Sequence, residues 1–320
     1  QWVERRNPKS QMVKRVGEKI IFGNMAKTTK APTTLSVPIG TANSFYNLTK
    51  DTFEHLAMAH GYTASGTHSI SSLFALPKIT TINDVFEQFA LHAQNRQRLS
   101  NVVKFRVNYR ALSGVLMGFD PGRFYSKYGM NVPAVATDLA IALKLSKPGK
   151  MINDYAQSLC YGAKYLRAFS SKSDVVADII GPSRTAATAK YGSPYTLQQF
   201  TECLIDTFRK NIRHGFGIAL TCDFLKELDA AFNFLAKPDV HIIDTLSHFI
   251  SFKGKDLDAV FAMQDLTNDI NASLLPTAHI TVYQLDKMIW LICSGSFPPL
   301  SSSSKFPAPL SMKGSYISRI

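Results

Sequence analysis

Apolar residues recur at helical spacing through most of the chain from Asn47 onward, and this periodicity constrains the fold more than any other feature. After Thr81 the apolar positions follow the three-and-four spacing of one helix face: Val85, Phe86, Phe89, Ala90 and Ala93. No segment shows the sustained alternation of a half-buried strand. The sequence therefore predicts an all-α fold.

Glycine, proline and serine clusters separate the expected helices. A stop is expected at Gly181-Pro182-Ser183. No repeat of 20–50 residues is visible, which argues against a solenoid. We expect helices near residues 51–60, 81–93, 134–146, 151–169, 172–180, 196–212, 218–228, 240–251, 255–271 and 281–293.

Positive charge is in excess, with 36 lysines and arginines against 23 acidic residues and a net charge of +13. A surplus of this size favours a polyanionic partner, nucleic acid above all, because phosphates neutralised by the protein release counterions. A basic protein that binds no polyanion is the alternative.

Three regions are expected along the chain. Residues 1–45 read as a basic N-terminal extension suited to a phosphate backbone, or else as a solvated tail. Residues 46–295 read as one helical domain, and residues 296–320, rich in serine and proline, as a loose C-terminal tail. A second basic run, over residues 96–110, is interpreted as a solvated surface, with a phosphate-contacting flank as the alternative.

The cysteines indicate neither a metal site nor an iron–sulfur cluster. They are far apart and form no Cys-x-x-Cys pair: Cys160, Cys203, Cys222 and Cys293. We expect no metal and no cofactor. No apolar run reaches the eighteen or so residues that a membrane span needs, so no membrane partner is expected.

A Gly-x-Gly turn, His214-Gly215-Phe216-Gly217, joins two of the expected helices. Two glycines allow positive φ and close approach to a ligand, and the N–H groups at the start of the helix from Ile218 form a natural phosphate site. Arg209, Lys210 and Arg213 add positive charge beside the turn. An ordinary tight turn is the alternative.

About twenty residues after the turn, Asp239 precedes the apolar start of another helix, Val240-His241-Ile242. Aspartate is a favoured N-cap, and a helix N-terminus favours its ionised form. A carboxylate so placed could also face the positive charge that develops on a sugar as its base leaves. Capping alone remains the alternative.

The spacing of the Gly-x-Gly turn and of the Asp-x-His-aliphatic segment 239–242 resembles the helix-hairpin-helix DNA glycosylases. The resemblance implies two helical subdomains flanking a DNA-binding cleft, with the hairpin at about 205–228. It implies that Phe216 packs between the hairpin helices and that Asp239 stabilises an oxocarbenium-like transition state and orients water. The DNA-contacting residues would be Arg213, His214, Gly215, Phe216, Gly217 and Ile218.

One departure from the family pattern is informative. Bifunctional members carry a lysine two residues after the second hairpin glycine, and the matching residue here is Ala219. A Schiff base requires an amine, so lysine-dependent strand cleavage is not expected. Lys237 precedes the acid, and we do not expect it to substitute.

A three-and-four series near the C-terminal end of the helical domain could line a base pocket, because flipped bases stack on aromatic rings and pair with polar groups. Ordinary helix packing is the alternative. The series comprises Tyr283, Asp286, Lys287 and Trp290, with Tyr283, Lys287 and Trp290 as the candidate pocket residues.

Together these features predict a monofunctional DNA N-glycosylase that flips a damaged or modified base and leaves an abasic site. The setting would be base-excision repair or antiviral defence against modified phage DNA. The partner would be double-stranded DNA, the protein a monomer, and the location cytoplasmic and nucleoid-associated, or nuclear. The alternatives are a non-catalytic helix-hairpin-helix DNA-binding protein and an unrelated helical interaction protein.

Overall fold

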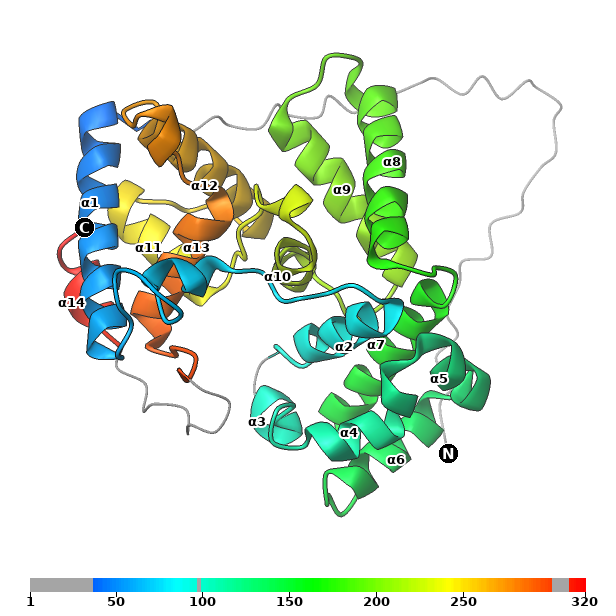
Figure 1. The fold of residues 1–320 in the computed structure, drawn as a ribbon. Coiled ribbons are helices and arrows are strands. Elements are labelled where there is room, and N and C mark those ends of the chain that lie inside the picture. The colour runs from blue at the N-terminus through cyan, green and yellow to red at the C-terminus, as the bar shows by residue number, and fades with distance from the viewer. Residues whose placement is uncertain (1–36, 97–98, 301–310) are drawn as a thin grey trace, which may run out of the picture. The chain divides into compact units, whose positions relative to one another are not determined.

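A computed structural model describes residues 37–96, 99–300 and 311–320. Most of the predicted basic extension, residues 1–36, and the serine- and proline-rich residues 301–310 lie outside the described residues. The described part contains fourteen α-helices and no strand, which confirms the all-α prediction (Figure 1). None of the helices in these ranges is long and apolar enough to cross a membrane.

Four of the longer helices begin at capping boxes, in which a threonine or serine and the residue three positions later satisfy each other's backbone N–H groups: Thr81, Ser171, Thr196 and Thr281. Local sequence therefore sets these starts. The helices are α1 Ile39–Ala59, α2 Ile82–Ala93, α3 Leu99–Val103, α4 Tyr109–Val115, α5 Pro121–Tyr128, α6 Val132–Ala142, α7 Lys150–Leu166, α8 Lys172–Tyr191, α9 Leu197–Ile212, α10 Ile218–Leu228, α11 Val240–Ile250, α12 Asp256–Asn271, α13 Val282–Ser294 and α14 Lys313–Ile317.

The buried apolar residues form two clusters. One, the hairpin core, is built mainly by α2 to α10. The other, the terminal core, is built by α1 and by α11 to α14, so it joins segments far apart in the sequence (Figure 1). Helix α12 contacts α9 and α10 of the hairpin core as well as its neighbours in the terminal core.

The terminal core includes segments that the sequence placed outside the helical domain. Helix α1 begins at Ile39, earlier than the expected start at residue 51, and buries Phe45 in the terminal core. At the other end, Tyr316 is fully buried and its hydroxyl lies 2.8 Å from the hydroxyl of Thr49. Residues 311–320 are therefore packed, whereas a loose tail was expected.

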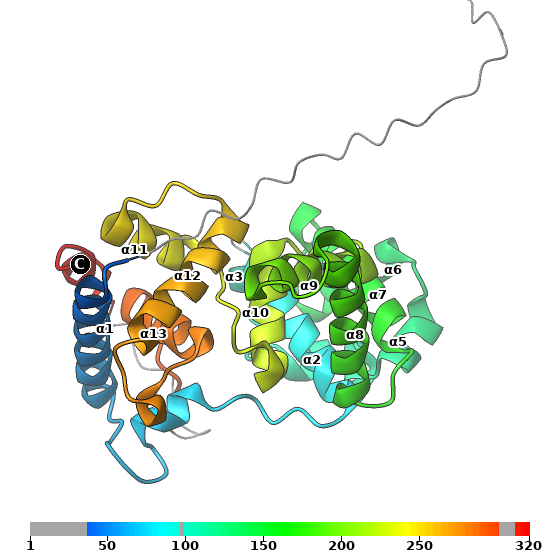
Figure 2. The ribbon, with the colours of Figure 1, turned by 90° about the horizontal axis from the view of Figure 1, so that it is seen from above.

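Helix α8 continues through Gly181 and Pro182, where the sequence predicted a stop. Its buried residues repeat every fourth position: Val175, Ile179, Ser183 and Ala187. This stripe faces α9, which lies beside α8 (Figure 2). Burial of a continuous stripe outweighs the local cost of an internal proline, which removes one backbone hydrogen bond.

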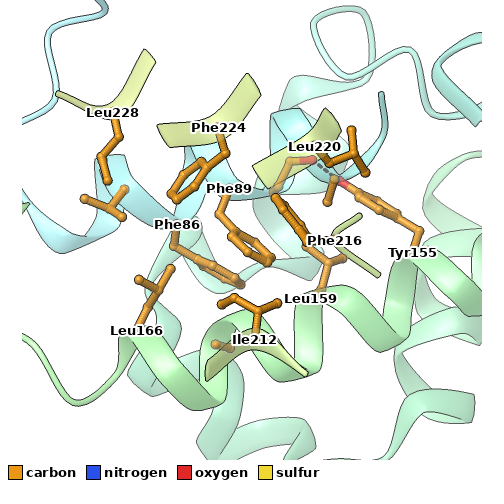
Figure 3. Close-up of a cluster of buried hydrophobic side chains, with 14 of the residues drawn as sticks. Phe86, Phe89, Tyr155, Leu159, Leu166, Ile212, Phe216, Leu220, Phe224 and Leu228 are labelled. Atoms are coloured by element: carbon orange, nitrogen blue, oxygen red, sulfur yellow. Dashed lines mark hydrogen bonds between the residues drawn. The ribbon is translucent and has the colours of Figure 1, made fainter. Parts of the chain in front are cut away.

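The Gly-x-Gly turn is anchored in the hairpin core by its central residue. Phe216 is 6% exposed and stacks on Phe89, with ring centroids 4.6 Å apart. The ring of Phe224 on α10 contacts it edge-on (Figure 3). The ring of Phe208 on α9 makes the same kind of contact. Such aromatic pairs add about 0.5–1.5 kcal/mol each beyond the burial of their area. The sequence-based expectation that Phe216 packs between the two helices matches this position.

Candidate functional site

The turn between α9 and α10 needs a glycine at only one of its two positions. Arg213 ends α9 in the left-handed region at φ 57°, and Gly215 follows at φ 84°. Gly217 has an ordinary φ of −74° and forms the N-cap of α10 without a side chain to accept a hydrogen bond. The first N–H groups of a helix lack partners within the helix, so this end of α10 carries free donors.

Gly215 lies against two side chains from distant segments. Arg96 donates to the Gly215 carbonyl at 2.7 Å, to the Asp154 carbonyl at 3.2 Å and to the Ser158 hydroxyl. A β-carbon at residue 215 would overlap both Ser158 and Arg96. A β-carbon at Gly217 would meet nothing within 4 Å. The first glycine is thus required by the fold, and the second borders open space.

A cavity of about 420 Å³, here called the turn cavity, lies at this turn. Its wall contains the predicted residues Arg213 to Gly217, whereas Ile218 packs against the hairpin core. Phe216 can offer a ligand only its backbone, because its ring is buried. Arg96 and Arg209 complete a cationic wall, so the turn cavity suits an anion in contact with backbone N–H groups.

Asp239 is the N-cap of α11. Its Oδ1 accepts hydrogen bonds from the backbone N–H groups of His241 at 2.9 Å and Ile242 at 3.3 Å. Its Oδ2 lies 4.0 Å from Nζ of Lys237, and the side chain is 18% exposed. Asp239 belongs to the wall of neither the turn cavity nor the second cavity described next.

A second cavity, of about 440 Å³ and here called the charged cavity, is lined by residues of α2, α10 and α13 and of the segments that follow them. Two of the three predicted pocket residues, Lys287 and Trp290, belong to its wall. Tyr283 does not; its ring is buried, with Nζ of Lys226 and of Lys287 each within 6 Å of the ring centroid, at 5.8 and 5.7 Å.

A network of charged side chains forms much of the wall of the charged cavity. Asp223 receives contacts from His92 Nδ1 at 3.0 Å and Lys237 Nζ at 3.1 Å. Glu227 lies 3.3 Å from Lys287 Nζ and 3.5 Å from His92 Nε2. Lys226 pairs with Asp286, and its Nζ also lies 3.9 Å from Asp223 Oδ1. Burying charges is costly unless each is paired, and every member of this network faces an opposite charge.

The pairing fixes the protonation states of the network. Burial alone lowers the pKa of His92, but the carboxylates of Asp223 and Glu227 raise it to about 9. Burial opposes ionisation of Glu227, yet His92 and Lys287 lower its pKa to about 2. His92 and Lys237 likewise hold the pKa of Asp223 well below its usual range. At neutral pH the imidazolium and both carboxylates are ionised.

The sequence did not single out the centre of this network. Asp223, Lys226 and Glu227 follow one another at three-and-four spacing on an otherwise apolar helix, which was a readable signal of a buried polar face. His92 gave no such signal, because it lies more than a hundred residues before its partner Asp223.

Among the described residues, no cluster of three or more His, Cys, Asp or Glu side chains is arranged to hold a metal ion. Comparison with known proteins found no matching family model, no matching curated protein and no matching solved structure.

Proposed function

We propose that this chain is a monofunctional DNA N-glycosylase that binds duplex DNA through the turn at residues 213–217 and excises a modified base with the carboxylate of Asp239. The observation that carries the proposal is the pairing of a cationic turn cavity at the N-terminal end of α10 with a separate charged cavity lined by the C-terminal half of α10. Lys237 lines the charged cavity, and its Nζ lies within 4.0 Å of Asp239.

The geometry of the turn supports the proposed binding of the DNA sugar–phosphate backbone. Three arginines and the uncapped N-terminus of α10 converge on one cavity, and open space beside Gly217 lets a phosphate approach the backbone closely. A helix N-terminus carries a partial positive charge, which favours an anion there. Such contacts position the protein on DNA without reading its sequence.

The charged cavity supports accommodation of a flipped base. Its volume lies within the range of about 300–1,000 Å³ that is typical of small-ligand sites. Trp290 contributes an aromatic ring to its wall, and flipped bases are held by stacking and by hydrogen bonds to their edges.

Asp239 would supply the anion that faces the sugar as the glycosidic bond breaks. One of its oxygens is held by two backbone N–H groups, which fixes the direction of the other. An oriented carboxylate of this kind stabilises developing positive charge without reorganising during the reaction. Lys237 lies between Asp239 and the buried Asp223 and provides the counter-charge when no DNA is bound.

The second candidate is a DNA-binding protein without catalysis. One observation favours it: both hydrogen bonds made by Asp239 are those of an N-cap, and the residue is in the wall of neither cavity. In that case DNA binding through the turn would remain, and the carboxylate would serve only helix α11.

Incubation with a panel of duplexes, each containing one modified base, tests the proposal when abasic products are revealed by alkaline cleavage. A glycosylase yields alkali-dependent strand breaks on at least one duplex and none without alkali, since Ala219 stands where a Schiff-base lysine would be needed. Affinity for DNA should fall steeply with salt for either candidate. Salt-dependent binding without breaks on any duplex supports the second candidate, and absence of binding removes both.

A further inference from the structure

The wall of the charged cavity carries more positive than negative charge. Its two carboxylates belong to Asp223 and Glu227, and each already contacts at least two cations of the network. The positively charged residues of the wall are His92, Lys104, Arg106, Lys226, Lys237 and Lys287. Asp286 and Asp239, which lie outside the wall, contact Lys226 and Lys237, but the cations of the wall still outnumber these four carboxylates.

The wall lysines offer hydrogen-bond donors as well as positive charge, and both favour a ligand with acceptor oxygens. A lysine ammonium has three donors and no acceptor. Lys287 donates a hydrogen bond to Glu227, and its ammonium group has two further N–H donors. Lys104 lies on the exposed rim of the cavity. A ligand that fills the cavity must bring acceptors, and a neutral apolar ring would leave these donors desolvated at a cost.

The size of the cavity is compatible with a substituted base. A volume of about 440 Å³ is within the range of small-ligand sites and accommodates a base together with a substituent. Trp290 offers a surface for a planar ring, while the lysines lie on other segments of the wall. A ring stacked on the tryptophan would leave space for a substituent beside the ammonium groups.

We infer that the charged cavity binds a nitrogen heterocycle bearing an acidic oxygen substituent, such as a carboxylated pyrimidine. The identification of this heterocycle as a base in DNA rests on the proposed function. The preference for an acidic substituent rests on the cavity alone. A phosphate of the DNA backbone shares the anionic chemistry, and the experiment below separates the two sources.

The first arm uses the full-length protein and free bases. Calorimetric titration with 5-carboxyuracil should give an affinity about tenfold higher than titration with thymine, because hydrogen bonds to charged groups are stronger than those between neutral groups. Inorganic phosphate at the same concentration should not displace 5-carboxyuracil. Equal affinity for the two bases, or displacement by phosphate, would overturn the inference.

Variants locate the binding site. Trp290→Leu should weaken binding of 5-carboxyuracil about tenfold, because the stacking of the base on an aromatic ring is lost. Trp290→Phe should restore most of the affinity. Lys104→Gln should weaken it a few-fold, whereas the matched control Lys147→Gln, which removes an exposed lysine elsewhere, should not. Identical affinity in Lys104→Gln and Trp290→Leu to that of the unaltered protein would place the ligand elsewhere and overturn the inference.

The second arm separates this inference from the proposed function. Duplexes containing 5-carboxyuracil or thymine at one position are assayed for excision. Preferential release of the carboxylated base supports both proposals. Release of thymine at the same rate as 5-carboxyuracil supports the glycosylase proposal but overturns the preference for an acidic substituent. Tight binding of free 5-carboxyuracil without excision of any base in the panel keeps the cavity inference and overturns the glycosylase.

Discussion

At the scale of single residues, the two glycines of the turn look alike in the sequence but have different physical roles. Gly215 is held at positive φ against Ser158 and Arg96, so the fold requires it. Gly217 has a φ that any residue adopts, and its missing side chain faces open space. A glycine that the fold does not require is the one expected to serve a ligand.

Alanine substitution should separate these roles. Gly215→Ala should destabilise the protein by about 2–4 kcal/mol, because it combines a strained φ with a steric overlap. Gly217→Ala should leave the midpoint of thermal unfolding within a few degrees of the unaltered value and lower DNA affinity about tenfold, because a methyl group obstructs a phosphate at the start of α10. Unfolding scans and DNA titrations measure both effects. Normal DNA affinity in Gly217→Ala would remove the phosphate from the turn cavity.

At the scale of elements, helix positions could be predicted wherever local chemistry decides them. The starts after Thr81 and Thr196, and the helix from Ile218 to Leu228, follow from caps and spacing. The early start of α1 and the continuation of α8 could not be predicted in this way. Both depend on tertiary burial: α1 packs against α13, which is distant in the sequence, and α8 packs against α9, the next helix along the chain.

Tertiary packing overrides local helix propensity in α8. Replacing its two helix-breaking residues with alanine should therefore stabilise the protein. Gly181 and Pro182 are exposed, and a β-carbon at residue 181 would meet nothing within 4 Å. Pro182→Ala should stabilise the protein by about 1–3 kcal/mol and Gly181→Ala by about 1 kcal/mol. Urea unfolding measures both, and a loss of stability in Pro182→Ala would mean that α8 depends on a bend at this residue.

At the scale of the whole molecule, the charged network links helices that the sequence separates. It joins His92 on α2, Asp223 and Glu227 on α10, and Lys287 on α13. The turn residues could be predicted from the sequence because they are contiguous. The charged cavity could be predicted only through Lys287 and Trp290, since its remaining residues meet through tertiary packing.

Stability should depend on pH through His92. Its pKa in the folded state is raised to about 9 from an ordinary value of 6.5. Stabilisation by the imidazolium is therefore fully present below pH 6.5 and is lost as pH rises toward 9, by up to about 3 kcal/mol at 1.36 kcal/mol per pKa unit. Urea unfolding at pH 6.5 and pH 9 measures this loss.

The variant His92→Gln provides the control. It cannot titrate, so its stability should change much less across the same window. Glu227 and Asp286 titrate lower, with pKa values of about 2 and about 6, and do not contribute between pH 6.5 and 9. The same pH slope in His92→Gln as in the unaltered protein would show that His92 is not held as an imidazolium.

The proposed glycosylase requires the carboxylate of Asp239 to act on the glycosidic bond, and single-turnover excision by Asp239→Asn tests this requirement most directly. Asparagine still caps α11, so folding and DNA affinity should be retained while the excision rate falls about a hundredfold or more. The matched control is Asp120→Asn, which alters the N-cap of α5 and should leave the rate unchanged. An Asp239→Asn protein that excises bases as fast as the unaltered protein would contradict the account.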